Sequence, residues 1–111
     1  MIFEVSCKLE RKIRLTDIQW VHIKAKHSEV SSEISKITET LQKPDFILYC
    51  MDDDNYQYYK FYQQTPVTQK HMLVIVKILN GDGFVITAFF VRRVRKEHKE
   101  AVYGKETLNQ L

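Results

Sequence analysis

Residues 71–93 read HMLVIVKILNGDGFVITAFFVRR, in which two long apolar segments flank the turn sequence NGDG at residues 80–83. Asparagine and glycine readily adopt the positive φ angles of a tight turn, so this arrangement predicts a β-hairpin. Its strands are expected to run from His71 to Leu79 and from Phe84 to Arg93. Upstream, Phe46 to Met51 and the aromatic-rich Tyr56 to Tyr62 also favour strands. The second half of the chain therefore predicts four consecutive strands that can pair antiparallel.

The first half of the chain predicts a strand and a first helix. Apolar residues alternate with polar ones, as in a half-buried strand, at Phe3, Val5, Cys7 and Leu9. Thr16 followed three residues later by Gln19 matches a capping box, which predicts a helix that begins near Asp17. This helix is apolar on two sides, because Ile18, Val21, His22 and Ala25 share one side while Trp20, Ile23 and His27 share the other.

Two further helices are expected. Ser28 is the predicted cap of the second, which carries a regular apolar stripe at Val30, Ile34, Ile37 and Leu41. Pro44 should close this helix, because the residue before a proline avoids the α region. Residues 94–102 can form a terminal helix. The order of elements predicts an α+β fold, with an N-terminal strand and two helices packed on one face of a mainly antiparallel sheet of four to five strands.

Composition limits the class of protein. The chain has 111 residues, of which 44% are apolar and 28% charged, so residues 1–111 are expected to form one globular domain. No apolar run approaches the ~20 residues that a membrane span needs, and Met1 to Lys12 lacks the apolar core of a signal peptide. We therefore expect a cytoplasmic protein that makes no membrane contact. The two cysteines and four histidines form no metal-ligand spacing, so neither a metal site nor a cofactor is predicted.

Basic residues gather near the C-terminus. The formal net charge is +3, and residues 91–111 hold six basic and three acidic residues. A cluster of this kind, Arg92, Arg93, Arg95, Lys96 and Lys99, suits a polyanionic partner. A solvated helix whose charge is partly offset by Glu97 and Glu100 explains the same residues about as well.

Three polar features of the strands are candidates for a site. Lys77 interrupts the apolar face formed by Leu73, Ile75 and Leu79, so its ammonium must reach water or an anion. Thr87 shares a face with Val85, Phe89 and Val91 on the strand expected to pair with it. Strand alternation puts Lys60 on the same face as Tyr56, Tyr58 and Tyr62. Tyrosines interleaved with a cation can stack bases and hold phosphates. Each feature also has a structural explanation. Lys77 can be an edge lysine, Thr87 can be present for its strand propensity, and the tyrosines can be amphipathic edge residues with their hydroxyls in water.

Histidine exchanges protons near neutral pH, so His22 and His27 are candidates for acid–base chemistry. Both lie near the end of the predicted first helix, beside Lys24 and Lys26. A histidine on an apolar helix face more often has a structural role, and this alternative remains open.

Several short motifs together resemble the phage-associated barnase–EndoU–colicin–RelE-like (BECR) nucleases. They extend from about Trp20 to Arg93 and are, in chain order, Trp20-x-His22-Ile23, Lys26-His27-x-Glu29, Pro44-Asp45-x-Ile47, Tyr58-Tyr59-Lys60, Leu73-Val74-Ile75-Val76-Lys77 and Ile86-Thr87-Ala88-Phe89-Phe90. Many members have His-Pro-Glu where this chain has His27-Ser28-Glu29. The order of predicted elements is also similar to that of RelE-type toxins.

The resemblance implies a RelE/barnase-like fold and a toxin-like endoribonuclease that cleaves RNA without metal, by attack of the 2′-hydroxyl on the adjacent phosphate. It implies His22 or His27 as acid and base, Lys77 and Thr87 as catalytic groups, and Lys60, Arg92 and Arg93 as cations for the substrate. Tyr58 or Tyr59 would stack a base. The partners would be RNA and an antitoxin or immunity protein. A noncatalytic RNA- or protein-binding module on the same fold is the alternative.

Overall fold

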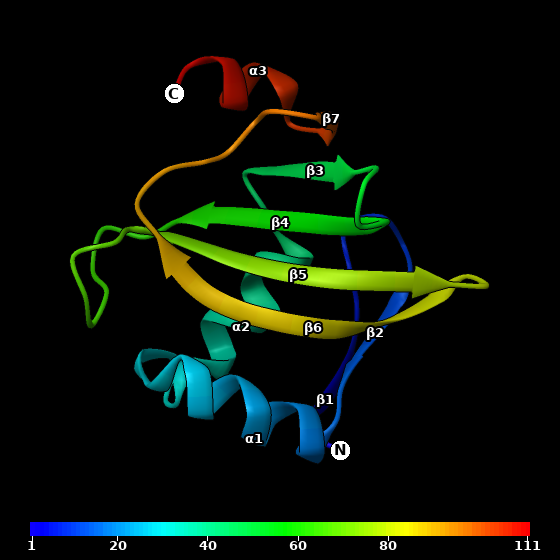
Figure 1. The fold of residues 1–111 in the computed structure, drawn as a ribbon, viewed down its shortest axis with the longest axis vertical. Coiled ribbons are helices and arrows are strands. Elements are labelled where there is room, and N and C mark those ends of the chain that lie inside the picture. Colours follow the sequence, from blue (N-terminus) through cyan, green and yellow to red (C-terminus); the bar gives the residue numbers. More distant parts are fainter.

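The hairpin predicted from residues 71–93 lies near the centre of a seven-stranded mixed sheet in the computed structural model, which describes residues 1–111 (Figure 1). Its strands are β5 (His71–Leu79) and β6 (Asp82–Val91). The other strands are β1 (Phe3–Ser6), β2 (Lys12–Leu15), β3 (Phe46–Cys50), β4 (Asn55–Phe61) and β7 (Lys99–Tyr103). They follow the order β1-β2-β6-β5-β4-β3-β7, and every pair is antiparallel except β2 with β6.

The predicted antiparallel series β3-β4-β5-β6 is therefore confirmed, and the α+β class with it. The register of the hairpin shifts at Ile86, because Ile75 pairs with Thr87 whereas the next residue, Val76, pairs with Val85. This bulge gives β6 one extra residue at Ile86, so the regular alternation of side chains between the two faces of the sheet is interrupted there. Val85 consequently faces the side of the sheet opposite to Thr87, which corrects the expectation that the two share a face.

The larger apolar core fills the side of the sheet that faces α2 (Ile34–Gln42). Ile37 and Leu41 of this helix are fully buried in the same cluster as Val74 and Val76 of β5. The stripe read from the sequence is therefore the buried face, and the helix ends at Gln42, just before Pro44, as predicted. In Figure 1, α2 passes behind the sheet, so the sheet face toward the viewer is the one without it.

Helix α1 (Asp17–Lys26) lies beside β6. Thr16 caps it by accepting a hydrogen bond from the Gln19 backbone amide at 3.2 Å, as the capping box predicts. The Gln19 side chain does not return to the cap but donates to the backbone carbonyl of Ile86, at the bulge. Of its two apolar sides, the one with Trp20 and Ile23 is buried, and the other is exposed.

The N-terminal half departs from the prediction in two places. The first strand ends at Ser6, and a turn leads into β2, whose Ile13 and Leu15 are fully buried. After α1 the chain forms a short 3-10 helix (Ser28–Val30) before α2, so Ser28 does not cap the second helix. The sheet is accordingly larger than the four to five strands expected.

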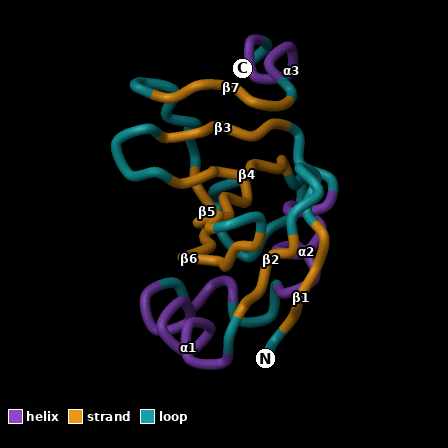
Figure 2. The backbone as a smooth tube through the Cα atoms, turned by 90° about the vertical axis from the view of Figure 1, so that its right-hand side faces the viewer, coloured by secondary structure: helices purple, strands orange, loops and turns teal.

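The predicted terminal helix over residues 94–102 is wrong. Residues 99–103 instead form β7, which pairs antiparallel with β3, and the helix α3 (Lys105–Asn109) follows. The free edge of β3 offers backbone partners, and Ala101 packs against the apolar residues on the second face of the sheet. Long-range pairing therefore overrides the local helix signal. Figure 2 shows β7 and α3 at one end of the molecule and α1 at the other.

Gly104 joins β7 to α3 with a φ of 70°, and an added Cβ would lie 2.2 Å from the Asp45 carbonyl oxygen. We expect Gly104→Ala to lower the free energy of unfolding by at least about 1–3 kcal/mol, because strain and a backbone clash combine. Gly81→Ala is the matched control: Gly81 has a φ of 94° and open space around it. Thermal unfolding of both variants measures the difference, and equal losses would contradict the clash.

No helix in the structure combines the length and the apolar character needed to cross a membrane.

Candidate functional site

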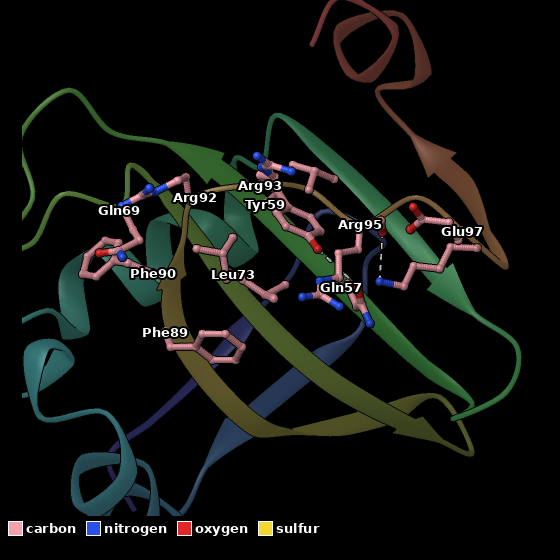
Figure 3. Close-up of a pocket in the computed structure, with 13 residues that line it drawn as sticks. Gln57, Tyr59, Gln69, Leu73, Phe89, Phe90, Arg92, Arg93, Arg95 and Glu97 are labelled. Atoms are coloured by element: carbon pink, nitrogen blue, oxygen red, sulfur yellow. Dashed lines mark hydrogen bonds between the residues drawn. The ribbon is translucent and has the colours of Figure 1, made fainter.

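A groove of about 960 Å³ lies on the sheet face that α2 leaves open (Figure 3). Its floor comes from the side chains of β4, β5 and β6 that alternate away from the larger core, among them Tyr59, Leu73 and Phe89. The segment that follows β6, residues 92–98, borders the groove before the chain enters β7. We call this face of the sheet the open face.

Cationic side chains dominate the charged lining of the groove. It contains four of them, Arg92, Arg93, Arg95 and Lys99, and one carboxylate, Glu97. None of the five takes part in an ion pair in the structure. The ammonium of Lys99 donates to the Arg95 carbonyl at 2.9 Å, and the three arginines are exposed. The guanidinium groups are therefore free to bind an anion from solvent.

Amides and a phenol form the polar part of the floor. Gln57 and Tyr59 are only 6% and 2% exposed, and both line the groove. The Tyr59 hydroxyl donates to Oε1 of Gln57 at 3.3 Å, and Nε2 of Gln57 donates to Oδ1 of Asn55 at 3.4 Å. Burial raises the pKa of Tyr59 to about 12, although the backbone and guanidinium of Arg95 oppose the shift. The phenol is therefore neutral, and a hydrogen-bond donor, at neutral pH.

His27 reaches the open face through Phe89. The two rings are stacked with centroids 4.5 Å apart and planes inclined by 14°. Nδ1 of His27 lies 3.8 Å from Oε1 of Glu29. His27 itself does not line the groove, but its ring lies against Phe89, which does.

Lys77 lies on the open face, on the same side of β5 as Leu73 and Ile75. The anion that its position on an apolar strand requires is Asp54, whose Oδ2 lies 3.5 Å from the lysine Nζ. The Tyr49 hydroxyl donates to Oδ1 of Asp54 at 2.8 Å. That hydrogen bond, and then the charge of Lys77, hold the pKa of the Asp54 carboxyl below its ordinary value. The acidic turn that contains Asp54 thus contributes a partner for Lys77.

Thr87 is half-buried on the open face, directly opposite Ile75 in the register. Lys77 is two residues beyond Ile75 on β5, so Thr87 and Lys77 are diagonal neighbours across the bulge at Ile86. Phe89 follows Thr87 on the same face of β6. Three of the four residues predicted to be catalytic, His27, Thr87 and Lys77, therefore lie on the open face, although none of the three lines the groove itself.

Other predicted residues lie elsewhere. His22 is exposed on α1, on the side turned away from the core. Lys60 points to the same side of β4 as Tyr58, the side that α2 covers, and its Nζ lies 3.9 Å from Oδ1 of Asp45. Tyr58 is fully buried there, and its hydroxyl donates to Cys7 Sγ at 3.0 Å, so its ring has no free surface for a base.

A second imidazole, His71, lies at the start of β5. Its ring meets the Phe61 ring edge-on, with the two ring centroids 5.5 Å apart, and its Nδ1 is buried without a hydrogen-bond partner. Burial lowers the pKa of His71, while the charge of Asp45 opposes the shift. His71 does not line the groove.

Sequence reasoning missed Gln57 and Gln69, which the groove adds to the predicted Tyr59, Arg92 and Arg93. A signal for Gln57 was present, because it is a polar residue between Tyr56 and Tyr58 in an aromatic-rich strand. No comparable signal marks Gln69, because it lies in the connection between β4 and β5.

Comparison of the chain with protein-family models, with curated proteins and with solved structures found no match. No group of three or more His, Cys, Asp or Glu side chains is arranged to hold a metal ion.

Proposed function

We propose that this protein is a small toxin-like endoribonuclease that binds RNA in the groove and cleaves it without a metal ion. The observation that carries the proposal is that His27, Thr87 and Lys77 lie on the same sheet face as the four basic residues of the groove. An imidazole, a hydroxyl and cations around a bound phosphate are the groups that this reaction needs. The order of elements supports a RelE/barnase-like fold as part of the same proposal.

In the proposed reaction, His27 removes the proton from a ribose 2′-hydroxyl. The 2′-oxygen attacks the adjacent phosphorus, and the bond from phosphorus to the 5′-oxygen breaks. The products are a 2′,3′-cyclic phosphate and a 5′-hydroxyl, whose oxygen takes a proton from water, and the His27 imidazolium then returns its proton to the solvent. Lys77 balances the negative charge that develops on phosphorus, and the Thr87 hydroxyl donates a hydrogen bond to it. Arg92 lies at the opposite end of the hairpin, because its neighbour Val91 pairs with His71 whereas Lys77 pairs with Phe84, so Arg92 would bind a neighbouring phosphate of the strand.

The proposal is tested by incubating the purified protein with single-stranded RNA in the presence of EDTA. We expect fragments that end in a 2′,3′-cyclic phosphate, identified by mass spectrometry. A substrate with a single 2′-deoxyribose at the cleavage position should stay intact at that position, because it lacks the nucleophile. RNA that remains whole while it is bound to the protein would contradict the ribonuclease.

A noncatalytic RNA-binding module is the second candidate. It is favoured by the ion pair between Lys77 and Asp54, which partly satisfies a proposed catalytic cation, and by the absence of His22 and Lys60 from the groove lining. This candidate predicts RNA binding that weakens with salt and leaves the substrate unchanged. The EDTA incubation therefore separates the two functions.

The proposal places the protein in the cytoplasm with RNA as its substrate. An antitoxin or immunity protein is a further proposed partner, and it would need acidic side chains to match the arginines of the groove.

A further inference from the structure

The floor and the rim of the groove differ in chemistry. The floor combines apolar and aromatic side chains, Leu73 and Phe89, with the amide of Gln57, and the exposed guanidinium groups of Arg92, Arg93 and Arg95 lie around it. Cations alone are sufficient to bind a phosphate, so a buried amide in the floor indicates a ligand with a further polar group. A nucleotide needs both, since its base has an apolar face and a polar edge while its phosphate is anionic.

Gln57 is placed among apolar neighbours, because Leu48 and Ile75 lie opposite it on β3 and β5. Burying an amide there is costly unless it is hydrogen-bonded. Its two bonds, at 3.4 Å to Asn55 and 3.3 Å from Tyr59, are longer than the usual 2.9–3.0 Å of strong hydrogen bonds. They occupy one donor and one acceptor position, so the amide keeps one of each for a ligand.

We propose that the groove binds an unpaired nucleobase of a single strand, and that Gln57 determines which base is preferred by hydrogen bonding to its edge. Gln57 and the Tyr59 hydroxyl lie together at the floor beside Arg95 (Figure 3). An amide can pair with two atoms of a base edge, and a base flanked by arginines carries its phosphates at the rim. In a duplex the bases are stacked and paired, so they cannot reach this floor. The inference rests on the proposed function only in that the groove binds nucleic acid.

The test uses 2′-fluoro oligonucleotides, which lack the 2′-hydroxyl and so cannot be cleaved by the proposed reaction. We expect a single strand to bind about tenfold or more tightly than the duplex of the same sequence, measured by fluorescence anisotropy. Among ten-residue strands of A, C, G or U, affinities should differ by about tenfold between the best and the poorest base. A DNA strand of the preferred base is a separate arm that distinguishes RNA from DNA as the source of the nucleobase.

Gln57→Leu and Gln57→Met should reduce the difference between bases to less than about twofold and leave the salt dependence of binding unchanged, because the arginines remain. Gln63→Leu, an exposed glutamine outside the groove, is the matched control and should keep the base preference. Both Gln57 variants introduce apolar side chains beside Leu48 and Ile75, and circular dichroism checks that they fold.

Equal binding of strand and duplex, or an unchanged base preference in folded Gln57 variants, would overturn this inference. These results leave the ribonuclease open, because cleavage is measured separately. Conversely, selective binding of one base without any cleavage of ordinary RNA would refute the ribonuclease and support the nucleobase site.

Discussion

Replacing His27 with alanine is expected to lower the rate of RNA cleavage by about 10²–10⁴-fold. The imidazole is the group assigned to remove the 2′-hydroxyl proton, and it stacks on Phe89, a residue that lines the groove. The affinity for uncleavable RNA should change by less than about threefold, because the arginines that hold the phosphates are untouched. Single-turnover cleavage and anisotropy measure the two quantities separately.

His22→Ala is the matched control for this variant. It removes the same kind of side chain from α1, the helix that His27 caps, at an exposed position on the side of the helix turned away from the core. We expect cleavage by this variant to stay within about twofold of the unmodified protein, as for an ordinary surface substitution. Equal rates for His27→Ala and the unmodified protein would exclude His27 from proton transfer, and a large loss in His22→Ala would place the reaction on another surface.

Neutralising three arginines, as Arg92→Gln, Arg93→Gln and Arg95→Gln together, is expected to abolish most of the RNA affinity. Each cation that contacts a phosphate of a single strand contributes about 0.7 to the slope of log affinity against log salt. The triple variant should therefore lower the slope by about 2. Between 50 and 200 mM salt, the unmodified protein should lose about 20-fold more affinity than the variant does. Anisotropy titrations at several salt concentrations measure both slopes.

A control with the same change in net charge is Arg11→Gln, Lys12→Gln and Arg14→Gln together. These residues are exposed in the hairpin of β1 and β2, and none lines the groove. A local phosphate site predicts little change in the salt slope for this variant. If both triple variants lowered the slope equally, binding would depend on the overall charge of the protein, and the groove would not be the RNA site.

Much of the fold could be read from local sequence. The NGDG turn between apolar segments identified the hairpin, Thr16 identified the start of α1, and Pro44 marked the end of α2. These signals act within a few residues, through turn geometry, capping and hydrophobic periodicity. The strand β2 was missed although Ile13 and Leu15 alternate with charged residues, because a four-residue strand carries a weak signal.

The candidate site depended on contacts that no local pattern contains. The sequence marked Lys77 as an anomaly on an apolar strand, but only the fold supplied Asp54 as its partner. The extra residue at Ile86 decided which side of β6 Thr87 would occupy. Tyr58 and Lys60 were correctly placed on a common side of β4, yet that side faces α2, where Tyr58 is fully buried and Lys60 lies beside Asp45, so neither residue reaches the groove.

The amino-acid sequence by itself determined the α+β class, the central antiparallel strands and the concentration of positive charge after residue 91, because propensity, periodicity and composition are local properties. Only the tertiary structure decided that residues 99–103 form a strand on the edge of β3, and that residues 92–98 therefore border the open face. The pairing of β3 with β7, about fifty residues apart in the sequence, therefore places Arg92, Arg93 and Arg95 beside the groove. Which face of each strand meets the helices, and which stays free for a ligand, is settled when the elements pack together.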